Sequence, residues 1–208
     1  MKCFMALSLL LLLASCNEEE HQPAATNPPV RKDSNLIRKA PANPFIDRDI
    51  SPMDISYFPA DYPVLKMTRG ISNPPVARVI YSRPHRQGRK IFGGLLKYGE
   101  PWRLGANEAT EIEFFRPVTV QGKRVAEGRY TMYAVPQEKE WTIVLNNNTF
   151  TWGLKQDSTK DVHRFTIPVQ PTEQNIEDFT MVFQRTSSGA DLIIAWDDVM
   201  ARLPIKVS

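Results

Sequence analysis

Apolar residues recur at every second position along most of the chain from Val76 onward, and this period is the strongest limit on its fold. The alternation is clearest in four runs, whose members on one face are Thr110, Ile112 and Phe114; Trp141, Ile143 and Leu145; Phe179, Met181 and Phe183; and Leu192, Ile194 and Trp196. Successive side chains of a strand point to opposite faces of a sheet. A period of two with one polar face is therefore typical of half-buried antiparallel strands.

Turn-forming residues separate these runs. Thr186–Gly189 joins two alternating runs as a hairpin loop would, and Asn146–Asn148 ends another run. No amphipathic helix is evident, and Asp197–Arg202 is long enough for one helical turn at most. We therefore predict an all-β domain over residues 76–208, an antiparallel β-sandwich of about eight strands, with a β-barrel as the alternative.

Residues 47–75 lack this alternation. Tyr57, Phe58 and Tyr62 stand there among prolines, which lack a backbone N–H donor and interrupt regular elements. The pattern predicts an irregular segment packed on the β-domain.

Both cysteines of the chain, Cys3 and Cys16, lie close to its N-terminus. The predicted domain therefore has no thiol for a disulfide, a thiolate zinc site, an iron–sulfur cluster or a cysteine nucleophile. His85 and His163 are the only histidines of that domain and cannot build a three-histidine site. We predict no metal and no cofactor. Twenty-six basic and 23 acidic residues are interspersed, which argues against a nucleic-acid partner.

The first residues have the pattern of a bacterial lipoprotein leader. Lys2 supplies a positive charge, and an apolar stretch follows that is shorter than the about 20 residues of a transmembrane helix. It ends in Leu13-Ala14-Ser15-Cys16, a branched apolar residue and two small ones before a cysteine. We predict a signal peptide over residues 1–15 and lipid attachment at Cys16. The alternative is an ordinary secretory leader with an accidental cysteine.

Residues 16–46 predict a flexible tether after the lipid-bearing cysteine. The stretch is rich in Pro, Ala, Asn and charge, so it cannot bury enough apolar surface to order itself. Its start, Asn17-Glu18-Glu19-Glu20, resembles the acidic export signal of surface lipoproteins in Bacteroidetes, with a solvated linker as the alternative. The expected location is the cell envelope, lipid-anchored in the outer membrane and, if the acidic run acts as a signal, exposed at the surface.

A set of short motifs is similar to those of the Domain of Unknown Function 2911 family. They are Tyr81-Ser82-Arg83-Pro84, Gly88-Arg89, Ile91-Phe92-Gly93, Tyr98-Gly99, Trp102 to Thr110, Gly128-Arg129-Tyr130, Trp141-Thr142, Asn146, Trp152-Gly153, and Asp161 followed by Arg164. The resemblance runs from about Val76 to the C-terminus, with departures at Lys97 and Leu104. It implies a secreted or lipid-anchored protein and no particular activity.

The densest group of polar and aromatic residues is Trp102–Thr110. Counting the alternation back from Thr110 puts Glu108 at the rim of the core face, where a carboxylate needs partners because burying it alone costs several kcal/mol. One interpretation is a structural lock in which arginines pair with Glu108. The other is a polar pocket for a glycan or peptide ligand, with flat tryptophan faces and directional hydrogen bonds. The ligand-binding candidates are Arg83, Arg89, Trp102, Arg103, Asn107, Glu108, Trp152, Asp161 and Arg164.

A catalytic role has weaker support in the sequence. His163 shares a face with Phe165 and Ile167, so it is predicted to be a core histidine, with Arg164 on the opposite face. The chain lacks the common hydrolase motifs, which leaves a glycosidase-like pair of Glu108 with Asp157 or Asp161 as an alternative. We predict no catalytic residue. The expected function is a binding or envelope-assembly module, and a third alternative is a structural subunit of a surface complex.

Overall fold

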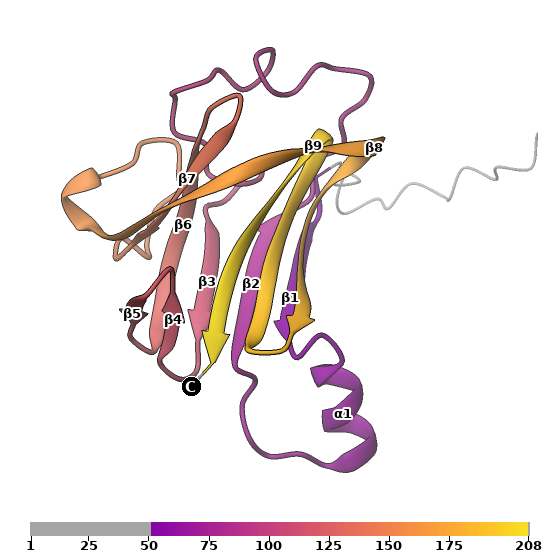
Figure 1. Cartoon of the computed structure of the whole chain (residues 1–208), viewed down its shortest axis with the longest axis vertical. Coiled ribbons are helices and arrows are strands. Elements are labelled where there is room, and N and C mark those ends of the chain that lie inside the picture. The colour runs from indigo at the N-terminus through magenta and orange to yellow at the C-terminus, as the bar shows by residue number, and fades with distance from the viewer. Residues whose placement is uncertain (1–50, 208) are drawn as a thin grey trace, which may run out of the picture. The chain divides into compact units, whose positions relative to one another are not determined.

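The computed structural model describes residues 51–207, which belong to the unit spanning residues 43–208. Nine strands, one α-helix and one 3-10 helix follow one another in these residues (Figure 1). In chain order they are β1 (Met53–Phe58), α1 (Tyr62–Arg69), β2 (Ala77–Ser82), β3 (Thr110–Phe114), β4 (Val118–Val120), β5 (Lys123–Val125), β6 (Gly128–Pro136), β7 (Glu140–Asn146), η1 (Ser158–Lys160), β8 (Asp161–Thr186) and β9 (Gly189–Val207). The predicted signal peptide, Cys16 and the tether lie outside the described residues.

All nine strands belong to one open antiparallel sheet, in the order β1-β2-β3-β6-β7-β8-β9-β4-β5. Strand β8 connects its two parts. Its first residues pair with β7, from Asn146↔Asp161 to Glu140↔Pro168. Its later residues pair with β9, from Val169↔Ala201 to Thr186↔Gly189. The long β8 thus makes one sheet out of what would otherwise be two.

The prediction of an antiparallel β-domain is confirmed: eight strands, β2 to β9, lie in residues 76–207, as predicted, and the structure differs from the prediction in how they are connected. Two runs predicted as separate strands, around Phe165 and Phe179, are parts of β8. Asp197–Arg202, assigned at most a helical turn, continues β9. The edge strands β1 and β5 have one neighbour each, so the sheet is not closed into a barrel.

The segment predicted to be irregular contains a strand and a short helix. Strand β1 pairs along β2 from Met53↔Ser82 to Phe58↔Ala77 and so extends the sheet. Helix α1 has a proline in its first turn, basic residues in its last turn and a left-handed Gly70 as its C-cap. None of its residues is buried. No helix in residues 51–207 is long and apolar enough to cross a membrane.

The core lies between the two parts of the sheet. Side chains of β1 and β2 meet side chains of the later part of β8: the rings of Tyr81 in β2 and Phe179 are 5.6 Å apart, and those of Phe58 in β1 and Phe183 are 6.2 Å apart. The predicted core members of β3 are buried, with Ile112 at 0% exposure. Helix α1 extends from one end of the sheet, and the long connection between β2 and β3 crosses the other end (Figure 1).

Candidate functional site

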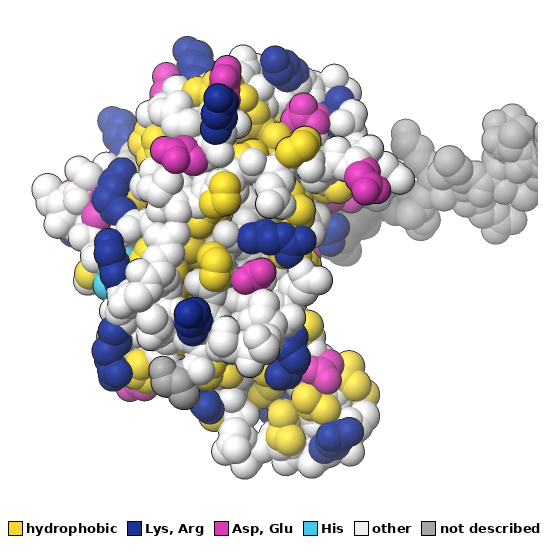
Figure 2. Space-filling model, viewed as in Figure 1, with side chains coloured by type: hydrophobic (Ala, Val, Ile, Leu, Met, Phe, Trp, Pro, Cys, Tyr) yellow, Lys and Arg dark blue, Asp and Glu magenta, His cyan; other side chains and the backbone are white. Residues whose placement is uncertain are grey.

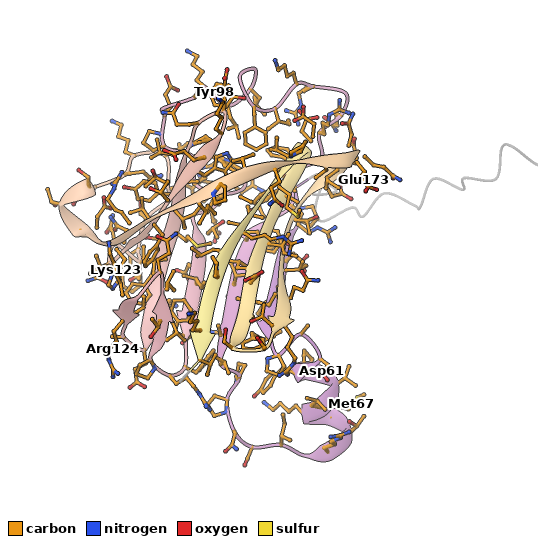
Figure 3. The ribbon with its side chains drawn as sticks, viewed as in Figure 1. Asp61, Met67, Tyr98, Lys123, Arg124 and Glu173 are labelled. Carbon is orange, nitrogen blue, oxygen red and sulfur yellow. The ribbon has the colours of Figure 1, made fainter. Side chains whose placement is uncertain are left out.

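A cleft of about 370 Å³ opens where the β2–β3 connection folds over the end of the sheet. The connection supplies most of its lining, Gly153 and Leu154 come from the β7–β8 connection, and Trp196 comes from β9. Figure 3 shows Tyr98, a residue of the same β2–β3 connection, at the opposite end of the domain from Asp61 and Met67 beside and within α1. Ser51, which precedes β1, also lines the cleft, so four segments of the chain meet there.

The first half of the β2–β3 connection is fixed to β8. The backbone N–H of Arg86 donates to the carbonyl of Glu177 at 2.7 Å, and the backbone N–H of Gln87 donates to the Glu177 carboxylate at 2.8 Å. Residue Phe179 donates in return to the carbonyl of Pro84 at 3.0 Å. These bonds give a connection without regular structure a defined path.

Asp197 of β9 holds the same connection from beneath. Its side chain is 7% exposed and its backbone φ is 55°, a left-handed conformation that aspartate tolerates better than most residues. One carboxylate oxygen is 2.6 Å from Nε of Arg86, and the other accepts a 2.9 Å hydrogen bond from the backbone N–H of Ile91. A single buried carboxylate therefore fixes two points of the wall of the cleft.

Two arginines line the cleft, and both are held by carbonyl oxygens. Arg89 donates from Nε to the carbonyl of Arg86 at 2.9 Å and from a terminal nitrogen to the carbonyl of His85 at 2.5 Å. Arg103 donates to the carbonyl of Trp152 at 3.4 Å. Partial burial lowers the pKa of Arg103 from its ordinary value, because desolvation disfavours the charged form.

His85 also lines the cleft, and its ring is oriented by a carboxylate. Nδ1 of His85 contacts Asp178, which lies 3.9 Å from a guanidinium nitrogen of Arg83. Arg83 in turn is 3.2 Å from Asp54 of β1. The Asp178 carboxylate and Arg83 thus belong to a charged network behind the cleft.

Trp102, predicted as a flat binding surface, is mostly a core residue. It is 5% exposed, its backbone exchanges hydrogen bonds with Ala134 of β6, and it lies in an aromatic cluster. The rings of Trp102 and Trp196 are stacked, with centroids 6.0 Å apart, and both side chains line the cleft. Phe92, Trp141 and Phe179 contact Trp102 edge-on. The aromatic cluster therefore provides a rigid floor to the cleft.

Glu108 and Trp152 lie together at a second hollow of about 390 Å³, which Glu111 also lines. Glu108 is exposed and makes no hydrogen bond or ion pair with another residue of the described part of the chain. The predicted lock between Glu108 and Arg83, Arg89 or Arg103 is wrong. Each of those arginines has other partners, as described above.

Glu108 lies outside the predicted core face because of the backbone conformation before β3. Strand β3 begins at Thr110, and the residues just before it are bent, with φ values of 57° at Leu104, 150° at Gly105 and 59° at Asn107. Alternation counted back from Thr110 does not apply to a bent segment. Asn107 is exposed as well, and its side chain donates to the carbonyl of Ser51 at 3.3 Å.

Asp161 and Arg164 form a separate network at the start of β8. Asp161 accepts hydrogen bonds from the Tyr133 hydroxyl at 2.9 Å, from the Asn146 amide at 2.8 Å and from Arg164 at 2.8 Å. Burial raises the pKa of Tyr133 to about 12, and its hydrogen bond to Asp161 acts in the same direction. Arg164 thus pairs with Asp161 of its own strand and not with Glu108.

His163 lies on the face of β8 that carries Phe165, as predicted. The two rings stack with centroids 5.7 Å apart. Burial lowers the pKa of His163, and Lys123 lowers it further, so the neutral ring is favoured. His163 lines neither the cleft nor the hollow beside Glu108.

Of the nine predicted ligand-binding residues, the structure brings Arg89, Trp102 and Arg103 together in one cleft. The sequence did not predict His85, Leu95, Leu154 and Trp196, which line the same cleft, or Asp178 and Asp197, which support it. Alternation placed Trp196 in the core but could not place it beside the β2–β3 connection. Within residues 51–207 no group of three or more His, Cys, Asp or Glu side chains is arranged to hold a metal ion.

Comparison with known proteins identifies one family. None of the curated proteins or solved structures compared with the chain matches it significantly. The family described as "Protein of unknown function (DUF2911)" matches residues 66–205, which begins ten residues before the resemblance noted in the sequence and includes the end of α1. Because the match covers most of the chain, the protein belongs to the DUF2911 family.

Proposed function

We propose that this protein is a lipid-anchored envelope protein whose β-domain binds a small glycan or peptide ligand in the cleft of the β2–β3 connection. The cleft itself is the observation that carries the proposal. Its volume of about 370 Å³ falls in the range of small-molecule sites, and its aromatic floor is set in a closely packed core. Binding sites commonly combine such a rigid apolar surface with a few fixed polar groups.

The apolar rim of the cleft also supports a binding role. Leu95 is 52% exposed and Leu154 is 73% exposed, although both line the cleft. Exposed leucines beside a concave site lose contact with water when a ligand covers them, and each buried methylene contributes about 0.8 kcal/mol. A ligand that touches both side chains gains from this burial.

The test is ligand binding to the full chain and to a double variant, Leu95→Ala with Leu154→Ala. A panel of glycans and cell-wall peptides is titrated by calorimetry and by ligand-observed NMR. We expect the double variant to weaken binding about tenfold, because it removes exposed methyl groups without disturbing the core. Val64→Ala is the matched control, since Val64 is 55% exposed on α1 at the other end of the domain. Equal binding by the double variant and the control would remove the cleft from the proposal.

For the anchor, we propose cleavage before Cys16 and attachment of lipid to its thiol, with an outer-membrane location. The motif Leu13-Ala14-Ser15-Cys16 supports this proposal, and the acidic run after it supports surface export. Two or three acyl chains would anchor the protein durably. In cells, Cys16→Ala should leave the chain unacylated and release it from the membrane fraction; a lipid-labelled Cys16→Ala chain contradicts the proposal. Protease treatment of intact cells tests surface exposure.

The other two functions receive less support from the geometry. A glycosidase-like pair needs Glu108 to face Asp157 or Asp161 across a cleft, yet neither aspartate lines the hollow beside Glu108, and Asp161 is held by three neighbouring side chains. A structural subunit of a surface complex would be identified by stable co-purification from intact cells that the Leu95 and Leu154 changes do not affect.

For the fold, we propose that the sheet bends into a β-sandwich. The later part of β8, with β9, β4 and β5, then packs over the remaining strands. The contacts between Tyr81 and Phe179 and between Phe58 and Phe183 support this description, because β1 and β2 are not neighbours of β8 in the sheet order. Sheet-on-sheet packing places side chains of two inner faces in one core.

A further inference from the structure

The charges that line the cleft have one sign. Arg89 and Arg103 contribute to its wall, and no aspartate or glutamate of residues 51–207 lines it. Elsewhere in the domain the two signs are mixed, as Figure 2 shows for one face. A cleft lined by one sign of charge raises the local concentration of ligands of the opposite sign.

The two arginines of the cleft differ in their partners from five other arginines of the domain. Five arginines form ion pairs with carboxylates: Arg78 with Glu113, Arg83 with Asp54, Arg86 with Asp197, Arg129 with Glu111, and Arg164 with Asp161. Arg89 and Arg103 form no ion pair within the described residues and donate to backbone carbonyls instead. A carbonyl orients a guanidinium group without neutralising its charge.

Both guanidinium groups keep donors for a ligand. Arg89 uses Nε and one terminal nitrogen, and its other terminal nitrogen has no hydrogen bond to the described residues. Arg103 uses one terminal nitrogen, in a bond of 3.4 Å to Trp152. The guanidinium group is a planar fork of five N–H donors, and two parallel donors can bind the two oxygens of a carboxylate. Hydrogen bonds between charged partners are about twice as strong as neutral ones.

Beside its polar residues, the cleft has apolar lining. Its floor is the stacked pair Trp102 and Trp196, and its rim includes Leu95 and Leu154. His85 adds a ring whose Nδ1 contacts Asp178, so Nε2 is the nitrogen left for a ligand. The cleft therefore offers cationic donors beside aromatic and aliphatic surface.

We propose that the ligand of this cleft carries a carboxylate, held by Arg89 and Arg103, next to an apolar or sugar body that covers the Leu95 and Leu154 side chains. This inference rests on the proposed function and specifies the class of its ligand. The shared chemistry is the carboxylate, and two sources fit it: the C-terminus of a short peptide, and an acidic sugar such as N-acetylmuramic acid. Each source has a neutral counterpart of nearly the same shape.

The experiment compares each acid with its neutral counterpart on the full chain. A short peptide with a free C-terminus is titrated against its C-terminal amide, and N-acetylmuramic acid is titrated against N-acetylglucosamine. We expect at least one acid to bind about tenfold more tightly than its neutral partner, because the neutral form loses the charge-assisted hydrogen bonds. The arm that shows the difference identifies the source.

Three variants place the effect on the two arginines. Arg89→Gln and Arg103→Gln should each weaken binding of the acid about tenfold and leave binding of its neutral partner nearly unchanged. Arg124→Gln is the matched control, because it removes the same charge from an exposed residue of β5, far from Tyr98 in Figure 3. Arg89→Lys keeps the charge and loses the planar fork, so it should recover only part of the affinity. Urea unfolding of each variant checks that the domain remains folded.

Two results would overturn the inference. In the first, acid and neutral probes bind equally and Arg89→Gln and Arg103→Gln change nothing, while the Leu95 and Leu154 variant still weakens binding; the proposed function then stands and the carboxylate does not. In the second, neither acid binds at about 10 mM, which excludes both sources of the carboxylate. A glycan or neutral peptide that binds in the second case would again retain the proposed function alone.

Discussion

Replacing Asp197 tests whether one buried carboxylate holds the wall of the cleft. The substitution Asp197→Ala removes the partner of Arg86 and the acceptor for the backbone N–H of Ile91, a residue with 0% exposure. It also puts an alanine at a φ of 55°, a left-handed conformation that a residue with a Cβ and no polar side chain adopts only at a cost. Asp197→Asn keeps an acceptor and a residue that tolerates this φ, and it loses only the charge.

The structure sets the size of each effect. Removing one member of a buried ion pair costs about 3–5 kcal/mol, but the Arg86 side chain is 23% exposed, so water compensates part of that cost. The unpaired N–H of Ile91 and the left-handed alanine each add roughly 1 kcal/mol or more. We expect Asp197→Ala to lower the free energy of unfolding by about 4 kcal/mol and Asp197→Asn by about 1–2 kcal/mol.

Urea unfolding measures the stability of both variants. The midpoints are compared when the dependence of the unfolding free energy on urea concentration is the same. Asp198→Ala is the matched control, because the neighbouring Asp198 is exposed and should change stability by less than about 0.5 kcal/mol. Limited trypsin digestion gives a second readout: cleavage after Arg86 or Arg89 should speed up in Asp197→Ala before the domain unfolds. An Asp197→Ala chain as stable as the Asp198→Ala control, and cut no faster, would refute the reasoning.

Three further predictions concern the core and the strands. Burial raises the pKa of Tyr81 to about 12 and of Tyr133 to about 12, so their contribution to stability is complete below about pH 10 and is lost as the pH rises toward 12; urea midpoints and tyrosinate absorbance across this range check it. Trp102→Ala should cost about 3–5 kcal/mol and Trp152→Ala less than about 1 kcal/mol, because Trp102 is 5% and Trp152 55% exposed; similar thermal midpoints for the two would contradict this. Gly189→Ala should lower the melting temperature by several degrees, since φ is 155° and the added Cβ would meet the carbonyl of Ile205; Gly122→Ala, with open space around it, separates strain in φ from this clash.

The strands could be predicted from the sequence because alternation reports which side chains are buried. It succeeded for β3, where Ile112 and Phe114 are buried, and for the hairpin at Thr186–Gly189. It could not show that β8 is continuous. Pro168 and Pro171 resemble strand breaks in the sequence, yet both are exposed within β8. The pairing of β8 with β9 shifts register between Pro171 and Ile176, so the N–H that Pro171 lacks costs little there.

The candidate site was less predictable, because its residues depend on contacts between distant segments. Arg89, Trp102 and Arg103 were identified from the composition of one connection, and the structure places them in one cleft. Asp197 was out of reach, since its partners Arg86 and Ile91 lie more than a hundred residues earlier in the chain. Which residues form an ion pair depends on how distant strands pair, and a local sequence pattern does not show that pairing.

The distribution of partners explains how the cleft can retain positive charge in a domain with many carboxylates. Glu177, Asp178 and Asp197 lie next to the β2–β3 connection, yet their carboxylates are used by the backbone of Gln87, by His85 and by Arg86. These acidic groups therefore fix the connection in place and do not neutralise the two arginines of the cleft. Arg89 and Arg103 are instead oriented by backbone carbonyls and keep their charge. They form a preorganised site for an acid, because the ligand has to order little when it binds.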